Sequence, residues 1–143
     1  MEKLLNLQKE YLWEPGVRQD YNIVSPINDE CVGQLSITRF ALEMPFVSNW
    51  SYLNKIEIEE SKRRQGWGFK TMLEINEMLK EEGRNGVLKN SIQNIKMKNF
   101  YDQLGWIHIE SIPKKWQFII NQSVSTFLLN KVVNEIVKGN FTK

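Results

Sequence analysis

A run of basic residues and glycines near the middle of the chain has the composition of an anion-binding turn. The segment Arg63-Arg64-Gln65-Gly66-Trp67-Gly68 lies between a strand-like alternation and a helical spacing of apolar residues. Glycines permit tight backbone geometry at such a junction, and free N–H groups of the first helical turn can hold a phosphate or pyrophosphate. The segment is neither a Walker A loop nor a Rossmann fingerprint. Two interpretations remain: a phosphate site, or a glycine-shaped connection with solvated basic side chains.

A second segment, Asn94 to Trp106, carries residues that suit proton transfer. Asn94 is a good N-cap for a helix, and the pair Phe100-Tyr101 follows two turns later. Gly105 has the composition of a helix end before a strand that begins near Trp106. A phenol is protonated at neutral pH and can serve as an acid. Tyr101 is therefore a candidate acid, with a core aromatic beside Phe100 as the alternative.

Together the two segments resemble the GNAT superfamily of acyl-CoA N-acyltransferases. The pyrophosphate motif of that family, Gln/Arg-x-x-Gly-x-Gly/Ala, is matched by Arg63, Gly66 and Gly68. Its later motif, an Asn, a Tyr seven positions on and a Gly-aromatic pair, is matched by Asn94, Tyr101, Gly105 and Trp106. The resemblance covers Leu53 to about Ile120, with both motifs in the family's order and spacing.

The resemblance implies acetyl-CoA as cosubstrate and assigns it a place. Backbone N–H groups from Arg64 to Phe69 would hold the pyrophosphate, and the pantetheine would pair with the preceding strand. A gap between that strand and the next, Val87 to Ile92, would admit the thioester to the centre of the sheet. The implied cofactor-binding residues are Ile56, Ile58, Arg63, Arg64, Gln65, Gly66, Trp67, Gly68, Phe69 and Asn94.

Direct attack of an amine on the acyl carbon requires a base, an oxyanion donor and an acid for the leaving thiolate. The resemblance makes Tyr101 the acid and a backbone N–H near Ile58 the oxyanion donor. Some family members place a Glu base on the second motif strand, but this chain has Lys89 there. Glu57, which faces away from the apolar strand residues, is the candidate base. A solvated strand carboxylate is the alternative interpretation of Glu57.

Composition excludes several other classes of protein. Lys plus Arg is 19 against 17 for Asp plus Glu, a net charge of +2 that does not indicate a duplex-binding domain. With Cys31 and His108 as the lone residues of their types, a disulfide and most zinc sites are excluded, and we expect no metal. His108 fits a surface position and Cys31 a strand. No apolar run approaches the length of a membrane span, and we expect a soluble cytoplasmic protein.

The elements that must position these residues form an α+β domain. We expect strands from Tyr21, from Cys31 to Leu42 and up to Ile58, a helix to Gly83, then strand, helix and two strands. This order predicts a GNAT-like mixed, mostly antiparallel central sheet flanked by helices. The predicted later segments are Val87 to Ile92, the helix after Asn94, Trp106 to Ser111 and Trp116 to Asn121.

The two ends of the chain depart from the family pattern. Residues 1–20 fit either a short helix or an extended segment, where the family has a strand and two helices that build much of the acceptor pocket. An additional C-terminal amphipathic helix is predicted from about Ser125 to Lys138. This helix either covers the core or forms a homodimer interface. At 143 residues, we expect residues 1–143 to form one N-acetyltransferase-like domain.

These observations lead to one main hypothesis and one alternative. The main hypothesis is an N-acetyltransferase that moves an acetyl group from acetyl-CoA to a primary amine by direct attack in a ternary complex. The amine could belong to a small molecule, a protein or an aminoacyl-tRNA. The alternative is a non-catalytic acyl-CoA-binding or protein-interaction module on a degenerate fold, consistent with Lys89 and the shortened N-terminal region.

Overall fold

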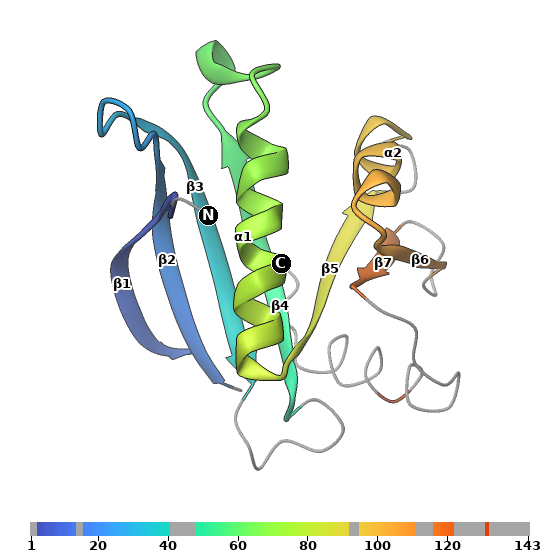
Figure 1. Cartoon of the computed structure of the whole chain (residues 1–143). Helices are drawn as coiled ribbons and strands as arrows, with labels where there is room; N and C mark the ends of the chain where they lie inside the picture. Colours follow the sequence, from blue (N-terminus) through green and yellow to red (C-terminus); the bar gives the residue numbers. More distant parts are fainter. Residues whose placement is uncertain are drawn as a thin grey trace.

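A single seven-stranded sheet organises the described part of the chain (Figure 1). The computed structural model describes residues 3–13, 16–40, 48–91, 95–110, 116–121 and 131. The strand order is β1-β2-β3-β4-β5-β7-β6, and every neighbouring pair is antiparallel except β4 and β5. The strands are β1 (Leu5–Trp13), β2 (Gly16–Val24), β3 (Cys31–Phe40), β4 (Trp50–Ile58), β5 (Asn85–Ser91), β6 (Ile107–Glu110) and β7 (Trp116–Ile120). The helices are a 3₁₀ turn at Glu60–Lys62, α1 (Trp67–Glu82) and α2 (Ile95–Gln103). The predicted α+β fold with a mixed, mostly antiparallel sheet is confirmed.

The N-terminal segment is extended, which decides between the two alternatives for residues 1–20. β1 and β2 form a hairpin whose register runs from Leu5↔Ile23 to Trp13↔Gly16. The prediction that the first clear strand starts at Tyr21 was wrong, because β2 already begins at Gly16. The polar residues in the first half of β2 mask a strand that is defined by backbone pairing with β3. With so short a connection, no helix separates the first two strands.

Helix α1 covers one face of the sheet, and Figure 1 shows it running across β3 and β4. Met72, Ile75 and Leu79 recur at helical spacing and are fully buried against the sheet. The helix ends at Gly83, as predicted, with φ of 65° and an N–H that donates to the Lys80 carbonyl at 3.2 Å. The core on this face also includes Ile23, Leu35, Ile37, Leu53, Leu88 and Ile119.

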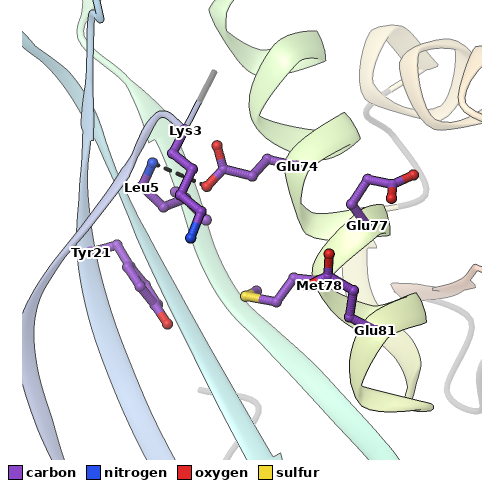
Figure 2. A pocket seen from close by; sticks show the side chains of 7 residues that line it. All are labelled: Lys3, Leu5, Tyr21, Glu74, Glu77, Met78 and Glu81. Carbon is purple, nitrogen blue, oxygen red and sulfur yellow. Dashed lines mark hydrogen bonds between the residues drawn. The ribbon is translucent and has the colours of Figure 1, made fainter. Parts of the chain in front are cut away.

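A carboxylate on α1 fixes the start of β1. Glu74 accepts hydrogen bonds from the Leu4 N–H at 2.5 Å and the Leu5 N–H at 3.2 Å (Figure 2). The Leu4 carbonyl in turn accepts from Val24 N–H at 2.8 Å. Between this clamp and α1 lies a cavity of about 420 Å³. It is lined by Lys3, Leu5, Tyr21, Glu74, Glu77, Met78 and Glu81.

The C-terminal part of the described chain completes the sheet. β7 pairs with β5 on one side and with β6 on the other, so two predicted strands are confirmed. α2 is followed by Gly105, which has φ of 82°, as predicted for a helix-ending glycine. The predicted helix from Ser125 to Lys138 falls outside the described residues except for Lys131, and it stays a prediction.

Candidate functional site

Strands β4 and β5 pair over a short distance and then part. Their parallel ladder consists of Trp50↔Asn85, Ser51↔Gly86 and Tyr52↔Val87. Over the described lengths of both strands, no pair follows these three, and Figure 1 shows β5 diverging from β4 toward α2. The gap expected between these strands is therefore present. It leaves the later half of β4 without a partner on that side.

The backbone of this half of β4 can be oriented from its other neighbour. The Glu59 N–H donates to the Val32 carbonyl at 2.8 Å, so Glu59 faces β3. Because backbone groups of a strand alternate between its two sides, the N–H and C=O groups of Ile56 and Ile58 face the gap. Consistent with this, the Ile58 carbonyl accepts a hydrogen bond at 2.9 Å from Arg63 Nε, outside the sheet. The gap is thus bordered by backbone groups with which an extended chain can pair.

A β-bulge lies where the two strands part. The register shifts between Ser36↔Lys55 and Ile37↔Leu53, which leaves Asn54 unpaired in the ladder with β3. The Thr38 hydroxyl donates to Asn54 Oδ1 at 2.6 Å and fixes that side chain. The bulge therefore sets the bend of β4 at the inner end of the gap.

The outer end of the gap meets the beginning of α1. Gly66 is the N-cap residue, with φ of 84°, a left-handed conformation that favours glycine. A Cβ atom at Gly66 would meet nothing within 4 Å, so the space above this turn is open. No acidic residue occupies the first turn of α1 to offset the positive end of the helix dipole. This turn can hold an anion on backbone N–H groups.

One cavity of about 590 Å³ joins the gap to this turn. It brings together nine of the predicted site residues: Ile56, Glu57, Ile58, Arg63, Arg64, Gly66, Trp67, Gly68 and Tyr101. Lys62 and Phe100 line it as well and were not predicted as site residues, although each is adjacent in sequence to one that was. Gln65 and Phe69 are not among its lining residues, and Asn94 lies outside the described residues.

The side chains of Gln65 and Phe69 have other surroundings. Gln65 Oε1 accepts a hydrogen bond from Trp67 Nε1 at 3.3 Å. Phe69 is 43% exposed. The prediction that both residues belong to the binding turn concerned its backbone, and their side chains add no wall to the cavity.

Tyr101 closes the inner side of the cavity from α2. It is 3% exposed, with the Phe100 ring edge-on at 5.1 Å and the Trp106 ring at 6.1 Å between centroids. Its carbonyl accepts hydrogen bonds at 3.0 Å from the N–H groups of Leu104 and Trp106, which fix the end of α2. Burial raises the pKa of the Tyr101 phenol to about 12. The phenol is therefore a protonated hydrogen-bond donor at neutral pH.

Glu57 lies at the edge of the cavity in a solvated setting. Its side chain is 60% exposed, and Oε2 is 3.6 Å from Lys55 Nζ. It also lines a smaller groove with Gly33, Gln34 and Glu59. Both its assignment as a base and the alternative of a solvated strand carboxylate stay open on these contacts.

The other singled-out residues lie apart from the cavity or outside the description. Cys31 begins β3, as predicted for a strand residue, and its thiol donates to the Gly33 carbonyl at 3.4 Å. The side chains of Lys89 and His108 are not described. Among the described residues, no group of three or more His, Cys, Asp or Glu side chains could hold a metal ion. None of the helices in the described ranges is long and apolar enough to cross a bilayer.

Comparison with known proteins identifies the fold. No protein-family model matches the sequence, and no curated protein matches it. Many solved structures do match. An acetyltransferase of the GNAT family from Staphylococcus aureus has 16% identity and a TM-score of 0.56, covering 73% of this chain and 69% of its own. The chain therefore has the fold of the GNAT superfamily, as the two sequence motifs predicted.

Two further matches were solved with coenzyme A. The PaiA N-acetyltransferase from Thermoplasma acidophilum has 14% identity and a TM-score of 0.58; 71% of this chain covers 59% of that protein. An acetyltransferase from Bacillus subtilis has 14% identity and a TM-score of 0.63, covering 84% of this chain and 98% of its own. The chain thus spans less than two thirds of the first of these proteins and nearly all of the second.

Proposed function

We propose that this protein is an acyl-CoA N-acyltransferase that transfers an acetyl group from acetyl-CoA to a primary amine. The observation that carries the proposal is the continuity of one cavity from the gap-facing backbone of Ile56 and Ile58 to the anion-binding turn at Gly66. A ligand with an extended, amide-containing arm and a pyrophosphate fits both ends of this cavity. Coenzyme A has that chemistry, and two proteins of the same fold were solved with it.

The reaction would proceed by direct attack within a ternary complex. The amine nitrogen bonds to the acyl carbon, a tetrahedral oxyanion forms, and the carbon–sulfur bond then breaks as the amine loses a proton. A gap-facing N–H of β4 near Ile58 would stabilise the oxyanion, and the Tyr101 phenol would donate to the departing sulfur. Glu57, directly or through water, would accept the proton of the amine.

The direct connection between β1 and β2 bears on the acceptor. Since no helix separates these strands, the part of the fold that builds much of the family's acceptor pocket is missing here. An open acceptor side would accommodate a small amine, a protein amine or an aminoacyl-tRNA. We leave these acceptor classes as the candidates.

A non-catalytic acyl-CoA-binding module is the second candidate. It is favoured by the setting of Glu57, which is the one carboxylate among the described residues of the cavity and is largely exposed beside Lys55. Lys89 stands where some family members carry a Glu. Such a module would bind the coenzyme but release no free thiol.

Calorimetric titration with acetyl-CoA tests the binding part of the proposal. We expect saturable one-site binding, with desulfo-coenzyme A binding similarly and ATP binding far more weakly. A thiol-release assay with a panel of amines, peptides and aminoacyl-tRNA then separates the two candidates. Binding without thiol release would favour the module, and no binding would refute both.

A further inference from the structure

We propose that Arg64, and not the motif arginine Arg63, supplies the cationic side chain that binds a phosphate of the coenzyme. The inference rests on the proposed coenzyme site and deepens it. Three cations line the cavity at the turn before α1: Lys62, Arg63 and Arg64. The contacts of these residues within the protein differ, and the difference assigns a separate role to each of them.

Lys62 and Arg63 are engaged in holding the turn. Lys62 Nζ lies 2.8 Å from Glu30 Oε1, which ties the turn to the β2–β3 connection. The same contact lowers the pKa of the Glu30 carboxyl. Arg63 Nε donates to the Ile58 carbonyl at 2.9 Å and closes the turn onto the end of β4. Both cations therefore stabilise the turn on which a phosphate would rest.

Arg64 has a different setting. It is exposed and has no hydrogen bond or ion pair with any residue the structure describes. Its φ is 65°, the left-handed conformation that costs an L side chain energy and is usually given to glycine. Strained non-glycine residues of this kind are concentrated at functional sites. A glycine would relieve the strain at position 64, so the arginine side chain itself has a use.

The chemistry of that use follows from the cavity. The backbone N–H groups of the first turn of α1 suit one phosphate group, and the Arg64 side chain projects from the turn two residues before Gly66. A guanidinium forms paired, charge-assisted hydrogen bonds with phosphate oxygens, which an ammonium cannot reproduce. Coenzyme A carries a pyrophosphate and a ribose 3′-phosphate, and either could be the partner of Arg64.

The test compares Arg64→Gln, Arg64→Lys and Arg64→Gly with the wild type by calorimetry, using coenzyme A and 3′-dephospho-coenzyme A. We expect Arg64→Gln to weaken coenzyme A binding by about 10- to 100-fold and Arg64→Lys to weaken it less. Lys80→Gln removes an equal charge from the far end of α1 and controls for the general loss of positive charge. The wild type should bind coenzyme A at least as tightly as this control.

Arg64→Gly supplies a readout that a merely structural residue would not produce. It removes the left-handed strain, so the melting temperature should rise by about 2 to 4 °C while affinity for coenzyme A falls. If the loss is absent with 3′-dephospho-coenzyme A, the 3′-phosphate is the partner; an equal loss with both ligands assigns the pyrophosphate. Wild-type binding combined with unchanged affinity in Arg64→Gln overturns this inference alone. Failure of the wild type to bind overturns the proposed function and this inference with it.

Discussion

Replacement of Tyr101 by Phe tests the chemistry proposed for the site. The phenol, with a pKa near 12, is ionised in only about one molecule in 30,000 at pH 7.5. It is a weaker acid than a thiol of pKa about 8.5, so complete proton transfer to the sulfur is uphill. The hydroxyl would instead donate a hydrogen bond as negative charge develops on the leaving group. Loss of such a bond costs about 1.5 to 3 kcal/mol, or roughly a 10- to 100-fold decrease in kcat.

The assay follows kcat, the Kd for acetyl-CoA and the melting temperature of Tyr101→Phe together. The Phe ring keeps the packing against Phe100 and Trp106, so Kd and melting temperature should change little. From pH 6 to 10, the phenol stays protonated, and it should add no descending limb to the kcat profile. Tyr21→Phe is the matched control, because that hydroxyl donates to Gln19 at 2.6 Å on β2. An unchanged kcat, or a loss confined to Kd, would refute the role of Tyr101.

Three further substitutions test other parts of the structure. Gly68→Ala should raise the melting temperature, because alanine favours a helix by about 1 kcal/mol, and should weaken coenzyme A binding, because the new Cβ lies 3.6 Å from the Phe100 ring in the cavity. Calorimetry showing unchanged affinity would contradict this placement. Glu57→Gln should lower kcat by about 10²- to 10⁴-fold if the carboxylate is the base; full activity assigns it to the solvated strand surface. The hydrogen bond from Arg39 lowers the pKa of Glu82, so the carboxylate stabilises the fold fully above about pH 4.5, and this stabilisation is lost as the pH falls through the lower folded-state pKa. Thermal melts should therefore show wild type and Glu82→Gln converging between pH 5 and pH 3, and a constant difference would count against this ion pair.

Local signals in the sequence predicted much of the fold. Gly83 and Gly105 correctly marked the ends of α1 and α2, because a positive φ at a helix end selects glycine. The family motifs placed Tyr101 and Gly66 on one cavity, although they are far apart in the chain. The first half of β2 was missed because a strand of polar residues has no apolar alternation, and its conformation is set by β3.

The organisation of the cations was beyond the reach of sequence reasoning. The motif predicts that Arg63 and Arg64 line the same turn, and both do. Which of them is free depends on the position of the Ile58 carbonyl relative to the turn, a tertiary contact that no spacing encodes. The same holds for Lys62, whose partner Glu30 lies on a different connection.

The short ladder between β4 and β5 has a consequence for the dynamics of the sheet. Only three residue pairs connect β1–β4 with β5–β7, so the two parts are expected to open as separate cooperative units in hydrogen exchange. A pantetheine arm paired with Ile56 and Ile58 would extend the bonded edge of β4 along the gap. The coenzyme would then act as a removable strand, and the amide protons on that edge should exchange more slowly when it is bound.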